Sequence, residues 1–236
     1  MAATDRITQS IAVGNFDHIA LQVNNAENEV VITQGQRESL TIDARPDVFA
    51  KIKAEVRNGQ LVIQMGGSRT DKISAALATS LSRLRIKYVV TVKNLTGLDV
   101  TGLAHVRVDH IETDRLQVKF GGLGNLDIAG LDAQRLDVDV TMPGPCQVEV
   151  SGRAGEQCVS LSGMGEYDAR GLESRKTTVA LKGPGGHAVV RVEDELNVTS
   201  GGVGRVEYYG QPRVTKKVSP MCVVTHLIDV EEVAAR

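Results

Sequence analysis

A repeat of about 20 residues is the feature that most constrains how this chain can fold. From Tyr88 onward, apolar–polar–apolar triplets recur, and a Gly-rich turn follows most of them. The residues that open the triplets are separated by 18, 20, 22, 21 and 17 positions; they are Leu98, Leu116, Leu136, Cys158, Val179 and Leu196. One unit holds two short strands and two turns, and it is too short for a pair of helices. The repeat therefore predicts an all-β stack of coils, a β-solenoid, over residues 86–215.

The alternation inside each unit predicts which side chains face inward. Successive side chains of a strand point to opposite faces, so Val, Leu and Ile would fill each coil and Asp, Glu, Arg and Thr would cover it. The chain has no Trp, 3 Phe and 4 Tyr, so aliphatic residues must build the core. Its 24 glycines supply bends such as Gly163-Met164-Gly165. An antiparallel sandwich is the alternative fold, because turn signals every 8–12 residues also fit it.

The N-terminal part lacks the repeat and mixes strand and helix signals. Residues 16–23 and 30–32 alternate as strands, and residues 40–42 are expected to form the return strand of a hairpin. Pro46 can open a short helix, because Val48, Phe49, Ile52 and Val56 recur at helical spacing.

Two further signals complete this part. Asn58-Gly59 predicts a tight turn before a strand at residues 61–63, and residues 71–82 are expected to form a second short helix. Residues 7–85 are accordingly predicted to be a strand and helix segment that caps one end of the solenoid.

The C-terminal segment, residues 216–236, is predicted to be a tail or cap of the same continuous domain. Residues 222–224 and 227–230 are too apolar to be exposed, so they are expected to cover the last coil or to contact a partner chain. A solenoid ends in open strand edges, which makes a homo-oligomer through an edge or the tail a further possibility.

Composition and motifs exclude several kinds of chemistry. The net charge of −2 gives no strong reason to bind nucleic acid, and no apolar run is long enough for membrane insertion or a signal peptide. The three cysteines, an odd number, lie at no zinc-ligand spacing from histidine and are expected to be small core residues. No catalytic residue, metal site or cofactor is predicted.

The predicted outer face carries acids and arginines that are expected to be solvated partners rather than a calcium or acid–base site. The acids are Asp99, Asp109, Asp127, Asp137, Asp139, Glu149 and Asp168, and the arginines are Arg107, Arg115, Arg135 and Arg153. Tyr208 and Tyr209 are weak candidates for a binding site. The alternative is a packing role, in which one ring closes the last coil and the other covers Pro212.

The repeats also carry a resemblance to a known family. The Gly-x-Gly turns lead to Val206-Glu207-Tyr208-Tyr209-Gly210-Gln211-Pro212, and residues 16–19, 31–35 and 52–61 also fit. Over residues 10–215 the chain resembles the head GIN domain of putative auto-transporter adhesins, a bacterial family of unknown function. The resemblance implies a right-handed β-helix-like fold and a periplasmic, lipid-anchored or extracellular location. It brings no catalytic residues.

Three hypotheses for function follow. The first is a non-enzymatic surface-associated module that binds an unknown protein or glycan or acts as a scaffold. The second is a carbohydrate-active enzyme, because right-handed β-helices often host polysaccharide lyases or hydrolases, although the short turns leave little material to wall a cleft. The third is an intracellular partner-binding domain, which requires that the natural chain begins at Met1.

Overall fold

The computed structural model describes residues 6–65, 85–141 and 146–228, and it consists of one sheet of 13 strands. The N-terminal elements are short: β1 (Ile7–Ile11), β2 (His18–Gln34), β3 (Ser39–Ala44), α1 (Pro46–Phe49), β4 (Ile52–Arg57), β5 (Gln60–Met65) and β6 (Arg85–Val92). The rest is built of β7 (Gly97–Val140), β8 (Cys146–Leu161), β9 (Glu166–Leu181), β10 (Gly186–Ser200), β11 (Gly204–Tyr209), β12 (Arg213–Val218) and β13 (Cys222–His226). The prediction of an all-β fold is confirmed.

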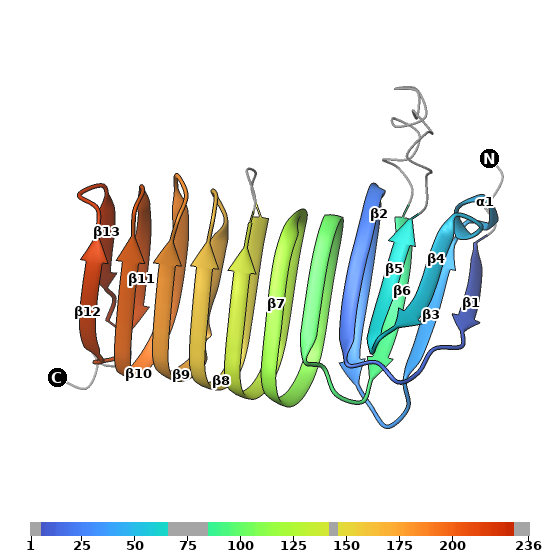
Figure 1. Ribbon diagram of the computed structural model, residues 1–236, viewed down its shortest axis with the longest axis horizontal. Coiled ribbons are helices and arrows are strands. Elements are labelled where there is room, and N and C mark those ends of the chain that lie inside the picture. The colour runs from blue at the N-terminus through green and yellow to red at the C-terminus, as the bar shows by residue number, and fades with distance from the viewer. Residues whose placement is uncertain (1–5, 66–84, 142–145, 229–236) are drawn as a thin grey trace.

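From β7 to β13, neighbouring strands run in the same direction (Figure 1). Gly124 pairs with Cys146 and Gly186 pairs with Gly204, so the partners lie 22 and 18 residues apart. The antiparallel sandwich alternative is therefore wrong for this part of the chain. Strands are long because the backbone stays hydrogen-bonded to its neighbours through the bends, with register shifts such as the one between Ile128 and Leu131.

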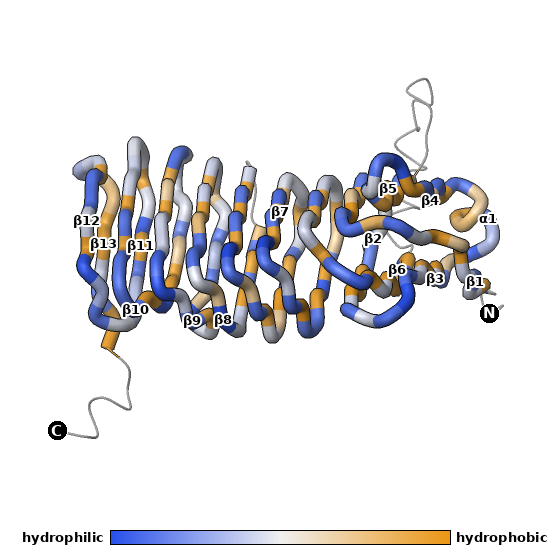
Figure 2. Tube along the Cα trace, turned by 60° about the horizontal axis from the view of Figure 1, so that its bottom comes forward, coloured by the Kyte–Doolittle hydropathy of each residue, from blue (hydrophilic) through white to orange (hydrophobic). Residues whose placement is uncertain are grey.

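Aliphatic side chains are buried inside the stack. Hydrophobic and hydrophilic residues alternate along the strands (Figure 2). Leu116, Leu136 and Leu196 are fully buried, as the repeat predicts. Cys158 is an exception. Gln157 pairs with Leu136 and takes the inward position, so Cys158 lies on the outer face beside Asp137. The triplet that begins at Cys158 is therefore displaced by one residue from the inward register.

A polar cluster explains how Gln157 is tolerated inside. Its side-chain amide donates hydrogen bonds to the hydroxyls of Ser174 (3.0 Å) and Thr177 (3.1 Å), and its oxygen accepts one from the hydroxyl of Tyr167 (2.8 Å). The Ser174 hydroxyl also donates to the carbonyl of Arg191 at 2.8 Å. Buried polar groups cost little only when they are paired, and each of these four side chains has a partner.

The predicted hairpin between residues 30–32 and 40–42 is wrong. Strand β3 pairs antiparallel with β1 and β6, and β6 lies between β3 and β2 in the sheet. Strand β6 takes the place beside β2 that the hairpin would have given to β3, although β6 begins some 50 residues after β2 ends. A contact between such distant segments leaves no signal in the local pattern.

The helix at Pro46 forms, but it is shorter than its apolar spacing indicated. It ends at Phe49, and Ile52 and Val56 belong to β4, which pairs antiparallel with β5. The turn at Asn58-Gly59 is confirmed, since both residues have positive φ (50° and 78°) and Arg57 pairs with Gln60. Pairing with β5, and packing of Ile52 and Val56 against the core, thus outweigh the helical spacing after Phe49. The helix predicted over residues 71–82 lies outside the described residues.

The C-terminal end is closed by β13, which pairs in parallel with β11. The His226 side chain donates from Nε2 to the carbonyl of Gly210 (2.7 Å) and stacks on the ring of Tyr208. Residues 222–226 therefore pair with the last coil, but the side chains of Val223 and Ile228 are largely exposed (55% and 62%). The expectation that the apolar tail is covered is wrong for these two residues within this chain, and residues 229–230 lie outside the described residues. None of the helices described is long and apolar enough to cross a membrane.

Candidate functional site: a groove at the corner of the stack

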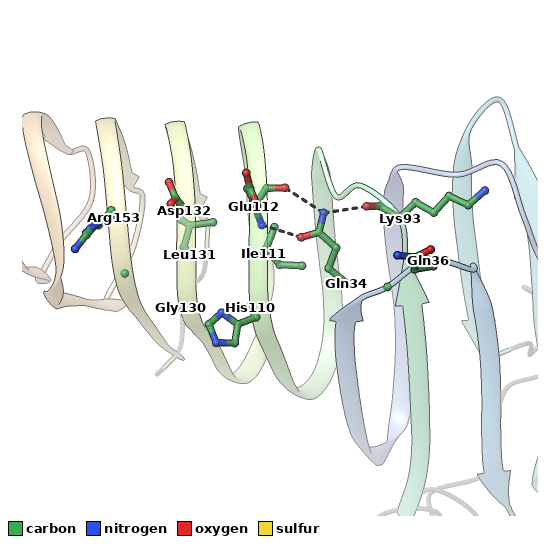
Figure 3. Close-up of a pocket in the computed structure, with 12 residues that line it drawn as sticks. Gln34, Gln36, Lys93, His110, Ile111, Glu112, Gly130, Leu131, Asp132 and Arg153 are labelled. Carbon is green, nitrogen blue, oxygen red and sulfur yellow. Dashed lines mark hydrogen bonds between the residues drawn. The ribbon is translucent and has the colours of Figure 1, made fainter.

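An open groove of about 820 Å³ lies at one corner of the stack (Figure 3). It begins where β2 ends and crosses three successive coils. The lining residues are Gln34, Gly35, Gln36, Lys93, His110, Ile111, Glu112, Gly130, Leu131, Asp132, Gly152 and Arg153.

The side chain of Gln34 fixes one end of this corner groove. Its amide donates hydrogen bonds to the backbone carbonyls of Lys93 (2.9 Å) and Glu112 (3.1 Å). Its oxygen accepts one from the backbone N–H of Glu112 (2.8 Å). The Gln34 amide thereby makes hydrogen bonds that a neighbouring backbone would otherwise make at the end of β2. It links the end of β2 to the backbone at Lys93 and at Glu112.

The middle of the groove depends on unusual backbone conformations. His110, Gly130 and Gly152 have positive φ values of 51°, 69° and 122°. The His110 imidazole lies directly against Gly130, where a Cβ would be 3.0 Å from Nδ1. Ile111 and Leu131 are buried beneath the corner and anchor it to the core.

Charged side chains of both signs line the outer part of the groove. Glu112, Asp132 and Arg153 are exposed and follow one another across successive coils (Figure 3), and Asp132 pairs in register with Arg153. Arg153 also lies 3.6 Å from Glu173, and Lys93 lies 3.6 Å from Glu38. Carboxylates, a guanidinium and amides offer hydrogen-bond acceptors and donors side by side, which suits a polar ligand lying along the groove.

The two tyrosines singled out from the sequence lie at the other end of the stack. Tyr208 is half-buried, packs against the core and stacks on His226 with 4.9 Å between ring centroids. The guanidinium of Arg191 lies over the Tyr209 ring at 5.0 Å. The structure brings neither ring to the corner groove, and their role in binding stays a prediction.

Three of the four arginines predicted on the outer face pair with two of the seven predicted acids. Arg107 contacts Asp109 (2.8 Å), and Asp137 accepts from both Arg115 (2.7 Å) and Arg135 (2.8 Å). Arg153 instead contacts Glu173. Within the described ranges, no three His, Cys, Asp or Glu side chains gather as a metal site would need. The three cysteines are free, with Cys146 and Cys222 buried and Cys158 half-buried.

Asp137 gives a test of these outer contacts. Partial burial alone would raise its pKa, but the hydrogen bonds from Arg135 and Arg115 outweigh burial and lower the pKa below its ordinary value. A lowered pKa in the folded state stabilises the fold above the unfolded pKa of about 3.9, and this contribution is lost as the pH falls through the folded value.

We therefore expect Asp137→Asn to reduce the free energy of unfolding by about 1–2 kcal/mol at pH 7. The difference from wild type should narrow below about pH 4, as followed by urea unfolding at a series of pH values. Asp139→Asn is the control, because Asp139 is exposed and accepts a long hydrogen bond (3.4 Å) from the Thr141 hydroxyl, which an asparagine oxygen can also accept. A pH-independent difference for Asp137→Asn would contradict this account.

Sequence reasoning did not identify the groove. It placed Arg153 on the solvated face, and it gave no binding role to Gln34, Glu112 or Asp132. The usable signal was the repeat itself, since Glu112, Asp132 and Arg153 are spaced by one coil length. Outward-facing residues separated by one repeat length lie in one row across the coils, as the inward-facing residues do.

Comparisons with known proteins agree with this architecture. The family model described as "Putative auto-transporter adhesin, head GIN domain" matches residues 15–212. No protein with a curated description matches the chain.

Three solved structures share the fold over nearly the whole chain. A putative adhesin from Bacteroides fragilis is 23% identical with a TM-score of 0.80, and 96% of this chain and 98% of that chain are covered. A putative adhesin from Parabacteroides distasonis is 17% identical with a TM-score of 0.69, at 95% and 98% coverage. A protein of the same organism described as a putative lipid binding protein is 18% identical with a TM-score of 0.72, also at 95% and 98% coverage. The match to the family model spans most of the sequence, and the chain accordingly belongs to the family of putative auto-transporter adhesin head domains, the GIN domain family.

Proposed function

We propose that this chain is a non-enzymatic, envelope-associated binding module of adhesin type, wound as a right-handed parallel β-solenoid. In this proposal residues 7–85 cap one end, residues 86–215 form the coils, and residues 216–236 form the tail or cap at the other end. Family membership and the parallel pairing of successive coils support this assignment. The names of the solved structures with the same fold, two putative adhesins and a putative lipid binding protein, point the same way.

The corner groove is the proposed ligand site, and a glycan is the proposed ligand. The observation that carries this is the row of Glu112, Asp132 and Arg153 on successive coils, in a groove that the exposed amide of Gln36 also lines. Neighbouring strands lie about 4.8 Å apart, which is close to the length of one sugar ring in an extended chain. Acids, amides and guanidinium groups at that spacing can each meet the hydroxyls of one sugar.

The test is binding to an array of bacterial and host glycans, followed by calorimetry on the glycans that bind. We expect the triple variant Glu112→Gln, Asp132→Asn, Arg153→Gln to weaken binding at least tenfold, which corresponds to about 1.4 kcal/mol. The matched control is Glu193→Gln, Asp194→Asn, Arg175→Gln, which makes the same chemical changes at exposed residues outside the groove. Equal affinity of both variants would overturn the groove assignment, and cleavage of a bound glycan would overturn the non-enzymatic assignment.

A further inference from the structure

Besides His110, four ionisable side chains line the corner groove, and the two cations among them already have acidic partners. The Lys93 ammonium lies 3.6 Å from the carboxylate of Glu38, and the Arg153 guanidinium lies 3.6 Å from that of Glu173. Neither of these acids lines the groove. The positive charges of the groove are therefore balanced by acids outside it.

The two acids of the groove lack such partners. Glu112 and Asp132 are exposed, and within the described ranges neither carboxylate makes a hydrogen bond or an ion pair. Asp132 lies in register with Arg153, but the guanidinium contacts Glu173 on the next strand instead. Figure 3 shows the Lys93 side chain directed away from Glu112. The groove thus presents two uncompensated carboxylates on successive coils.

Charges next to the groove leave this excess in place. Arg37 follows Gln36, Asp114 lies two residues after Glu112, and these two exposed residues carry one charge of each sign. Other charged residues nearby form ion pairs among themselves: Arg107 with Asp109, and Arg115 and Arg135 with Asp137 and Glu156. The surroundings are therefore neutral, and the excess of two negative charges belongs to the groove.

Two free carboxylates favour a ligand that carries ammonium groups. An ionised carboxylate only accepts hydrogen bonds, whereas a primary ammonium brings three donors and a full positive charge. A calcium ion would need six or more oxygen ligands, and in the described part of the chain not even three acidic, His or Cys side chains gather. Hydroxyl groups of a neutral sugar would leave both carboxylates without a counter-ion.

The distance between coils distinguishes an aminated glycan from a basic peptide. Neighbouring strands lie about 4.8 Å apart, which is close to the length of one sugar unit in an extended chain. In an extended peptide, side chains on the same face repeat only every 6.6–6.8 Å or so. Amino groups on consecutive sugar units therefore match consecutive coils more closely than lysine side chains do.

We propose that the corner groove selects glycans with free amino groups, such as chains of de-N-acetylated hexosamine, over neutral and acidic glycans. This inference rests on the proposed function, since it names the class of glycan that the groove would bind. Glu112 and Asp132 would each accept hydrogen bonds from the ammonium of one sugar unit. A uronic acid at the same place would be repelled by both carboxylates.

Two hexamers of the same linkage, β-1,4-linked glucosamine and its N-acetylated form, test this selection by calorimetry. We expect the glucosamine hexamer to bind at least tenfold more tightly, and added salt to weaken the binding of that hexamer alone. A galacturonate hexamer should not bind. Equal affinity for the first two hexamers, a preference for galacturonate, or retention by the glycan array only of glycans without free amines would overturn the inference.

These failures are distinct from failure of the proposed function. If no glycan of any kind binds, the proposed function itself is wrong, whereas binding of acetylated or acidic glycans leaves it standing. A lysine hexamer serves as the peptide control. Binding of this peptide as tightly as the glucosamine hexamer would mean that the groove recognises basic peptides, and it would overturn the inference as well.

A matched pair of variants tests the two carboxylates. Glu112→Gln with Asp132→Asn should weaken binding of the glucosamine hexamer by about tenfold and change binding of the N-acetylated hexamer less than about twofold. Glu193→Gln with Asp194→Asn removes the same charges at exposed residues outside the groove and should have less than about a twofold effect on either. All four residues are exposed, so thermal unfolding should confirm that both variants are folded. Equal losses from the two variants would show that binding follows the net charge of the protein, which contradicts the inference.

Discussion

Gly152→Ala is expected to destabilise this protein by about 3 kcal/mol or more, a large effect for the addition of a single methyl group. Gly152 has a φ of 122°, where an L side chain is strained. A Cβ there would overlap the backbone carbonyl oxygen of Leu131 on the preceding coil. Neither atom belongs to a flexible side chain, so the paired strands at Leu131 and Gly152 must move apart or the backbone must change conformation. Thermal unfolding should show a fall in Tm of roughly 6–12 °C.

Gly201→Ala is the matched control for this substitution. Gly201 also lies in a bend, but a Cβ added there meets no atom within 4 Å, and its φ is outside the left-handed region. Alanine at such a position reduces the freedom of the unfolded chain, so we expect a change of about 0 to +1 kcal/mol in stability. Similar Tm values for the two variants would show that the coils separate more easily than the close approach of Gly152 indicates.

Gln157→Leu is expected to lower the free energy of unfolding by about 2–3 kcal/mol, although leucine fits the site. Leu136 occupies the equivalent inward position on the preceding coil. Leucine at residue 157 removes the acceptor of the Tyr167 hydroxyl and the donor to Ser174 and Thr177. The Tyr167 hydroxyl then stays buried without that partner, and ionisation cannot relieve it because burial already raises the pKa of Tyr167.

A double-mutant cycle separates hydrogen bonding from packing. Tyr167→Phe removes the hydroxyl that loses its acceptor, so Gln157→Leu with Tyr167→Phe should be more stable than the sum of the single losses by about 1–2 kcal/mol. Urea denaturation of the four proteins measures this difference. Additive losses would mean that the cost of Gln157→Leu comes from packing and not from an unpaired hydroxyl.

The repeated parallel strands were predictable from sequence because their two requirements are local. Each unit needs an apolar residue at every second position and glycine where the chain bends close to its neighbour, as at Gly124 and Gly204. Both requirements repeat after about 20 residues, so the pattern accumulates over several units. The same logic placed the start of α1 at Pro46 and the turn at Asn58-Gly59.

The features that the sequence did not predict share a different physical origin. Strand β3 lies beside β6 because a segment distant in sequence occupies the edge of β2, and no local pattern reports such competition. Gln157 was not placed inside, because a buried amide is acceptable only if Tyr167, Ser174 and Thr177 all reach it. The groove residues were missed for the same reason, since Gln34, Glu112 and Lys93 meet only after the coils stack.

Parallel pairing of each coil with only its two neighbours has a consequence for how the molecule comes apart. In such a quasi-one-dimensional array, opening begins at the ends and travels inward, because an interior coil must break two interfaces and a terminal coil only one. At one end the last described rung is β13, a strand of five residues. Backbone amide hydrogen exchange should therefore be fastest at β13 and should slow progressively toward the middle of β7. Protection against exchange should thus rise from one coil to the next, in the order in which the coils are stacked.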